Sequence, residues 1–100
     1  MKTFRTYNLA IQFHKDCQNL KLSVVAKDQF DRALLSIPLN LAEGYAKPTE
    51  KDRKKFYFVA LGSMREVQTL LELFGTKELL EKADNLAAHV YRLCHSHSHG

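Results

Sequence analysis

Residues that make turns are scarce in this chain of 100 residues, which has four glycines and two prolines. That supply is too small for the many tight turns of an all-β fold. Long apolar runs are also missing, since none approaches the roughly 18–20 residues of a membrane span. No apolar segment that could form a signal peptide follows Met1. These absences favour a protein of the cytoplasm that has no part in a membrane.

Cysteine is as scarce as proline. Cys17 and Cys94 are the two cysteines of the chain, and each lies within a helical pattern. Free, partly buried thiols in a reducing cytosol are the expected state. A disulfide between the first and last helices is the alternative.

The residues that are present fit one ordinary globular domain. Apolar residues make up 45% of the chain and charged residues 26%, as is usual for such a domain. Fifteen lysines and arginines stand against eleven acidic residues, which gives a formal net charge of +4. This mildly basic balance permits an acidic partner such as RNA or DNA, but it does not require one.

Apolar residues recur at the i, i+3, i+4 and i+7 spacing of amphipathic helices in four segments. We predict helices over residues 6–20, 24–46, 50–74 and 77–93. Thr3 or Thr6 could cap the first helix, and Ser23, Thr49 and Thr76 are expected to cap the last three. Gly75 is expected to end the third as a C′ residue, a position where left-handed glycine is common. Residues 22–25 have β propensity, but a single short strand would have no partner. Short links favour an all-α, antiparallel, up-down-up-down four-helix bundle, a single domain over residues 1–94 with a flexible His/Ser tail at 95–100.

The second helix is apolar on two sides. One broad side belongs to the core, and Leu35, Leu39 and Ala42 lie on the other. A surface helix needs one apolar side, so we expect another subunit or a flanking helix to cover these three residues. The predicted core residues are Tyr7, Ala10, Ile11, Cys17 and Leu20 in the first helix, Ala26, Phe30, Ala33, Leu34, Ile37, Leu41 and Tyr45 in the second, Phe56, Val59, Ala60, Ser63, Val67, Leu70, Leu71 and Phe74 in the third, and Leu79, Leu80, Ala83, Leu86, Ala87, Val90, Tyr91 and Cys94 in the fourth.

A proline lies inside the second helix. Pro38 has no backbone N–H to donate, so the helix should bend there. Ser36, Asn40 and Glu43 form a narrow polar seam between the two apolar sides. Because burying polar groups without partners is costly, we expect this seam to bond a facing helix and to specify packing. Gly44 could let that neighbour approach closely or begin the end of the helix.

Two blocks, "SIPLNLAEGY" at 36–45 and "KKFYFVALGSMREVQTLLEL" at 54–73, carry a family resemblance. The chain resembles the four-helix-bundle proteins encoded in intervening sequences of bacterial 23S rRNA genes. The accessory variability proteins (Avd) of diversity-generating retroelements belong to the same structural group. The resemblance implies an antiparallel bundle that assembles into a ring, in several cases a homopentamer. For the Avd proteins it also implies binding to a reverse transcriptase and to nucleic acid.

The resemblance also places Ser63 and Glu66 opposite Asn40 and Glu43, with Arg65 or Arg32 neutralising a carboxylate. Two carboxylates could hold a metal or act as an acid/base pair, but no histidine or nucleophile is positioned with them. We therefore expect a structural polar network that fixes the register of the helices. Its predicted members are Ser36, Asn40, Glu43, Ser63 and Glu66.

A basic run surrounds the link between the second and third helices. It holds five basic residues, offset by Glu50 and Asp52, for a local balance of +3. Such charges bind phosphates without sequence preference, and one of the aromatic residues 56–58 could stack on a base. The alternative is a solvated helix start whose aromatics turn inward. The predicted nucleic-acid contacts are Lys47, Lys51, Arg53, Lys54 and Lys55.

Histidines offer two further, weaker signals. Alternating His95, His97 and His99 could bind a transition metal loosely. Arg92 with His97 matches the loose R-x4-H pattern of HEPN-type ribonucleases, but Leu93 replaces the polar residue that usually follows the arginine. His14 has no second ligand at i+3 or i+4, so we expect it to be partly buried and structural. We therefore predict no metal, no cofactor and no enzymatic activity.

The sequence as a whole predicts a non-enzymatic homo-oligomer, a pentamer if its relatives are a guide. It would bind RNA or DNA through a repeated basic surface, with a reverse transcriptase as a further partner. A structural, protein-interaction bundle without nucleic-acid binding is the alternative.

Overall fold

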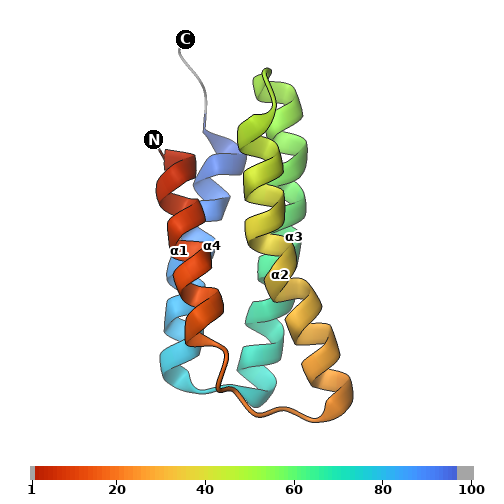
Figure 1. Ribbon diagram of the computed structural model, residues 1–100. Coiled ribbons are helices and arrows are strands. Elements are labelled where there is room, and N and C mark those ends of the chain that lie inside the picture. Colours follow the sequence, from red (N-terminus) through yellow and green to blue (C-terminus); the bar gives the residue numbers. More distant parts are fainter. Residues whose placement is uncertain (1, 97–100) are drawn as a thin grey trace.

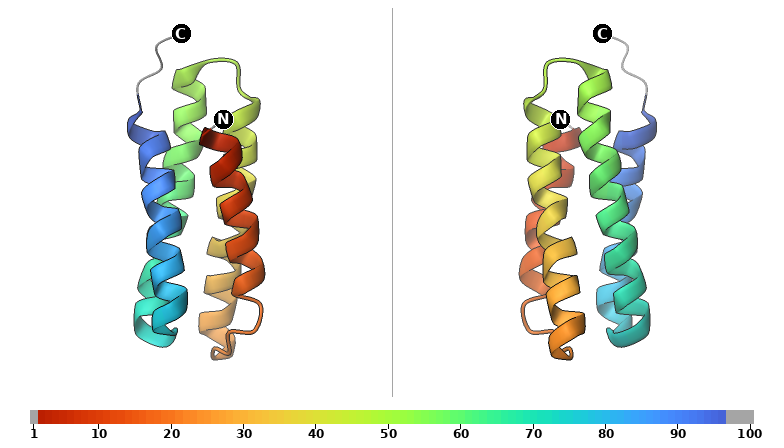
Figure 2. Two further views of the ribbon diagram at one scale, coloured as in Figure 1. Left: turned by 90° about the vertical axis from the view of Figure 1, so that its left-hand side faces the viewer. Right: turned by 90° about the vertical axis from the view of Figure 1, so that its right-hand side faces the viewer.

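The computed structural model describes residues 2–96, which form four α-helices. They are α1 (Lys2–Asp16), α2 (Val24–Ala46), α3 (Glu50–Phe74) and α4 (Lys77–His95). Each helix runs antiparallel to the next, and α1 closes the bundle by packing against α4 (Figures 1 and 2). The start of α1, the α2–α3 turn and the end of α4 therefore lie at one end. The predicted all-α four-helix bundle is confirmed.

Three hydroxyl caps set where helices begin. Ser23, Thr49 and Thr76 each accept a hydrogen bond from the backbone N–H three residues further on, at 3.2–3.3 Å. Each cap satisfies one of the orphan donors of a helix start. The bounds predicted for α2 and α3 are thereby confirmed, while α4 extends through His95, beyond the start predicted for the tail.

Gly75 ends α3 as predicted, but it does so without the left-handed backbone that is common for a glycine at this position. Its backbone is extended, with φ −96°, and is not left-handed. A Cβ atom here would lie 2.8 Å from the carbonyl oxygen of Leu71. The helix end needs glycine because there is no room for a side chain.

The first helix lies about a turn earlier than predicted. It covers Lys2–Asp16, and residues 17–23 form the connection to α2 without any strand. Thr3, Thr6 and Phe13 are buried, whereas Ile11 is half-buried. Ala10 and Cys17 are buried as predicted, but the apolar pattern missed the two threonines of this face. The Thr3 hydroxyl lies 3.1 Å from the Tyr57 hydroxyl, so its burial is satisfied.

The buried face of α3 is also rotated from the predicted one. Tyr57 and Met64, which are not among the predicted core residues, are buried, while the predicted Val59 and Phe74 are 52% and 56% exposed. Gly44 explains part of the rotation, because a Cβ atom there would lie 2.6 Å from Cε1 of Tyr57. The expected close approach at Gly44 is confirmed, and it draws the Tyr57 ring inward.

The second helix keeps its two apolar sides. Phe30, Ile37 and Leu41 are buried as predicted, and the helix changes direction near its middle, where Pro38 lies (Figure 1). Leu35 and Leu39 are 51% and 56% exposed. Within residues 2–96 no flanking helix covers them, so that alternative is wrong. Cover by a second subunit stays a prediction.

Both cysteines are free and buried, at opposite ends of the bundle. Cys17 follows α1 and Cys94 lies in the last turn of α4, so an internal disulfide between them is excluded. Burial, and then the neighbouring Asp16 carboxylate, raise the pKa of Cys17 to about 12. Burial likewise raises the pKa of Cys94 to about 11.

No helix among the described residues is long and apolar enough to cross a lipid bilayer.

Candidate nucleic-acid interface

The five basic residues around the α2–α3 turn do different things. Arg53 Nε donates to the carbonyl oxygen of Lys47 at 2.7 Å, which closes the turn. Lys47 Nζ lies 5.1 Å from the centroid of the Phe56 ring. Lys51 is exposed and has no hydrogen bond or ion pair with another described residue. Arg53 is therefore a structural residue of the turn, and the lysines are the groups left for a ligand.

Three of these lysines have a carboxylate neighbour three or four residues away in the chain. Lys54 pairs with Glu50 at 3.2 Å, and Lys55 Nζ lies 3.6 Å from Asp52. The Lys47 ammonium lies 3.8 Å from Glu43. Surface pairs at this spacing are worth only about 0.3–0.5 kcal/mol. An incoming phosphate can therefore displace the carboxylates at little cost.

The two ends of the bundle differ in charge. Residues 3–9, 36–61 and 86–96 form the end that holds the α2–α3 turn. They include seven lysines and arginines against three acidic residues, a balance of +4. Residues 10–35 and 62–85 form the other end, with seven basic against eight acidic residues, a balance of −1. We call the first of these the basic end.

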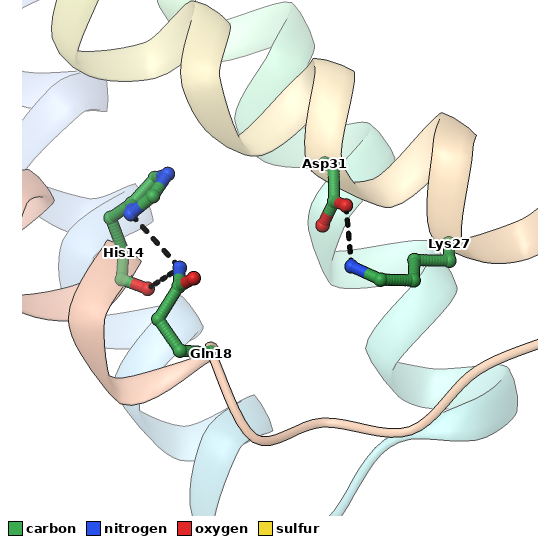
Figure 3. Close-up of polar contacts among 4 residues, drawn as sticks. All are labelled: His14, Gln18, Lys27 and Asp31. Atoms are coloured by element: carbon green, nitrogen blue, oxygen red, sulfur yellow. Dashed lines mark hydrogen bonds and ion pairs between the residues drawn. The ribbon is translucent and has the colours of Figure 1, made fainter.

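Polar groups at the opposite end bind one another. Lys27 pairs with Asp31 at 2.6 Å on α2, and Gln18 Nε2 donates to the His14 carbonyl oxygen at 2.7 Å (Figure 3). The same amide nitrogen lies 3.0 Å from His14 Nδ1. His14 is half-buried within this local contact. These interactions indicate a structural role for His14, as expected.

One of the three predicted stacking candidates reaches the surface. Tyr57 is buried, and Phe56 lies half-buried beneath Lys47. Phe58 is 48% exposed and packs edge-on against His95 at 5.6 Å between ring centroids. Tyr91, which the helical pattern assigned to the core, is 47% exposed and lies 4.2 Å from His95. We call Phe58, Tyr91 and His95 the aromatic cluster; it joins α3 to α4 at the basic end.

The predicted polar network is smaller than expected. Ser63 Oγ donates to Ser36 Oγ at 2.7 Å across the α2–α3 contact. Asn40 Nδ2 donates to the carbonyl oxygen of Ser36 at 2.8 Å and lies 3.0 Å from its Oγ. Glu43 and Glu66 are both exposed and stay outside this cluster. One hydrogen bond, from Ser63 to Ser36, therefore joins the seam to the facing helix, and Asn40 bonds Ser36 within α2.

The arginines expected beside those carboxylates bind elsewhere. Arg65 donates to Gln68 at 2.9 Å, and Arg32 pairs with Asp28 at 3.1 Å. Within residues 2–96 no group of three histidine, cysteine, aspartate or glutamate side chains could hold a metal ion. The Glu43–Glu66 carboxylate pair considered for acid/base chemistry does not form, because both side chains point to solvent.

Two predictions fall at the C-terminal tail. Arg92 is exposed in the last turn of α4. His97, its partner in the ribonuclease pattern, and His99 of the alternating histidines lie outside the described residues.

Fold and surface together define a small, antiparallel four-helix-bundle protein with one basic end and an exposed apolar face on α2. The chain belongs to the 23S rRNA-intervening sequence protein family, whose family model matches residues 2–98. Searches of curated proteins and of solved structures found no match to the chain.

Proposed function

We propose that this protein is a non-enzymatic, homo-oligomeric module of the cytoplasm that binds RNA or DNA through its basic end. The observation that carries the proposal is the charge partition: a balance of +4 at one end against −1 at the other. Phosphate backbones are attracted to such a surface regardless of base sequence. Lys51, Lys54 and Lys55 lie in the first turns of α3, where the positive end of the helix dipole adds to their charge.

The aromatic cluster suits a single strand better than a duplex. Bases that are free of a partner can stack on Phe58 or Tyr91, and such stacking is tolerant of sequence. The lysines of the α3 start lie one to two helical turns before Phe58. Charge and stacking surface are therefore near enough for one short strand to use both.

Self-association is the second part of the proposal. The outer side of α2 presents Leu35, Leu39 and Ala42, and beside it lies a largely apolar hollow of about 200 Å³ between α1 and α2. Phe4 and Tyr45, both about half exposed, form its walls. Contiguous apolar surface of this kind is a common mark of an interface. A ring, with five subunits by family resemblance, would repeat the basic end and raise affinity through multivalency.

The test of nucleic-acid binding is fluorescence anisotropy with single-stranded and duplex RNA and DNA across a salt series. The reversal variant is Lys51→Glu, Lys54→Glu and Lys55→Glu together. Its matched control reverses three lysines at the opposite end, Lys15, Lys21 and Lys77, for the same change in net charge.

We expect salt-dependent binding that the first variant loses and the control largely keeps. Equal binding by both variants, or no binding at low salt, would reject the nucleic-acid part in favour of a protein-interaction bundle. The Avd resemblance makes a reverse transcriptase the protein partner to test by co-purification.

A further inference from the structure

A small notch lies between the first half of α1 and the second half of α4. Its volume is about 140 Å³, and it is lined by Arg5, Thr6, His89, Arg92 and Leu93. A single water needs roughly 10–15 Å³ of such space, so the notch admits a group several times larger. Thr6 and Leu93 are buried and form the floor, while Arg5 and Arg92 are exposed at the rim.

The side chains around this notch are basic and lack acidic partners. The side chains of Arg5, His89 and Arg92 make no hydrogen bond or ion pair with another residue whose side chain the structure describes. The nearest acidic residue along α4 is Asp84, five residues before His89 and eight before Arg92; it lines the neighbouring hollow with Arg92 and accepts a hydrogen bond from Gln68. Lys47, Lys54 and Lys55, by contrast, each have a carboxylate within 4 Å. Without an anion between them, the positive charges of Arg5 and Arg92 at the notch repel each other.

The pKa of His89 depends on the charges of both arginines. Burial lowers the pKa of its imidazole, and the charges of Arg92 and then Arg5 lower that pKa further. Arg5 faces it from α1 and Arg92 from its own helix, and these are the charged groups that act on it among the described residues. The ring is therefore neutral near pH 7, and a negative charge in the notch would favour its protonation.

We propose that this notch is an anion site that binds a phosphate group between Arg5 and Arg92, with His89 as a third donor. Guanidinium forks match the oxygens of a phosphate and bind it in a bidentate manner. The notch lies at the basic end, so a nucleic-acid chain held there by the lysines could place a phosphate in it. This source of the phosphate rests on the proposed function, whereas binding of the group itself does not.

The first test is a titration of the whole protein with inorganic phosphate, followed by NMR signals of the His89 ring. We expect a saturable shift and a rise in the pKa of His89 when phosphate is bound. The variant Arg5→Gln/Arg92→Gln should weaken binding at least tenfold. The control Lys15→Gln/Lys77→Gln carries the same change in charge at the opposite end and should bind as the parent does.

A second variant shows whether weaker binding reflects the loss of the guanidinium groups or the loss of the fold. Arg5→Lys/Arg92→Lys keeps both charges and removes the planar forks, so we expect it to fold and to bind phosphate less tightly than the parent. Thermal melting checks the fold of each variant. Absence of a saturable His89 shift in the parent, or equal binding by parent and both arginine variants, would overturn the proposal.

A further arm identifies the source of the phosphate and separates this site from the proposed function. Oligonucleotides with a 5′-phosphate or a 5′-hydroxyl are compared with inorganic phosphate as competitors at the notch. Preference for the 5′-phosphate assigns a nucleic-acid end, and competition by inorganic phosphate alone assigns the free ion. The reversal variant at Lys51, Lys54 and Lys55 should still bind inorganic phosphate at the notch.

The anion site and the proposed nucleic-acid function can be rejected independently of each other. If no oligonucleotide binds but inorganic phosphate saturates the notch, the nucleic-acid function fails and the anion site stands. If oligonucleotides bind equally well to the parent and to Arg5→Gln/Arg92→Gln and phosphate leaves His89 unmoved, the anion site fails and the function stands.

Discussion

Glycine 44 shows how one missing side chain sets the contact between two helices. Its hydrogen faces the Tyr57 ring, and a Cβ atom would lie 2.6 Å from Cε1 and 3.0 Å from the carbonyl oxygen of Arg53. The ring can retreat little, because its hydroxyl contacts the hydroxyl of Thr3 at 3.1 Å. α1, α2 and α3 thus meet at Tyr57.

We predict that Gly44→Ala lowers the free energy of unfolding by about 1–3 kcal/mol, the usual effect of overpacking a core. Gly62→Ala is the matched control. It lies inside α3 with open space around it, so alanine should raise stability by about 0.5–1 kcal/mol through helix propensity. Chemical denaturation of both variants measures the difference. A neutral Gly44→Ala would show that Tyr57 moves freely.

His89 should make the stability of the bundle depend on pH. Its pKa is lowered in the folded state, so the unfolded chain binds the proton more tightly. The stability that the neutral His89 ring contributes to the folded state is therefore fully present above the unfolded pKa of about 6.5. This stability is lost as pH falls through that value towards the folded pKa.

The experiment compares the parent with His89→Gln, which removes this one imidazole and leaves the rest of the chain unchanged. Between about pH 7.5 and pH 5.5, across the usual range of histidine, the parent should lose more stability than the variant. Parallel stability curves would contradict the predicted pKa shift. Added phosphate should reduce the acid loss of the parent if the notch binds it.

At the scale of elements, the contact between α2 and α3 is specified by polar groups as well as by apolar packing. Ser36, Asn40 and Ser63 form a chain of hydrogen bonds of 2.7–3.0 Å at the middle of both helices. The contact is part-buried, so each lost partner leaves a polar group poorly satisfied. The cluster lies beside Pro38, where α2 bends.

We predict that Ser36→Ala and Ser63→Ala each reduce stability by about 0.5–1.5 kcal/mol, the net worth of a typical hydrogen bond. A double-mutant cycle should give a coupling of at least about 0.5 kcal/mol, because residues in contact are not additive. Glu66→Gln, on the exposed side of α3, is the control and should change stability by less than about 0.5 kcal/mol. Strict additivity of the two serine variants would show that the contact contributes nothing.

Local sequence signals predicted the bounds of most helices correctly. The prediction failed for α1, where the predicted capping signal was wrong. The hydroxyl caps located α2, α3 and α4 because capping depends on neighbours within one turn. Thr3 and Thr6, the caps predicted for the first helix, lie inside it and are buried. The apolar pattern found Ala10 and Cys17 on the core face, but it could not assign threonines to that face.

For the whole molecule, the question is what covers the outer side of α2. Leu39 is 56% exposed in a single chain, and Ala42 borders the apolar hollow between α1 and α2. Burial of one leucine at an interface contributes about 1.5–3 kcal/mol. A ring would repeat this contact at every boundary between subunits.

We predict that Leu39→Glu lowers the mass of the particle in solution and leaves its helical content largely intact. Leu73→Glu is the matched control, because Leu73 is 66% exposed on α3 away from that face. Its mass should equal that of the parent. Light scattering with circular dichroism measures both quantities, and a monomeric parent would rule out the ring.

The amino-acid sequence by itself determined the number and class of the elements and their antiparallel order, because these follow from periodicity, caps and short links. Only the tertiary structure decided which face of α3 is buried, since the space at Gly44 draws Tyr57 inward. It also decided which charged groups meet. Arg5 and Arg92 lie at opposite ends of the chain, and packing of α1 against α4 brings them to one notch.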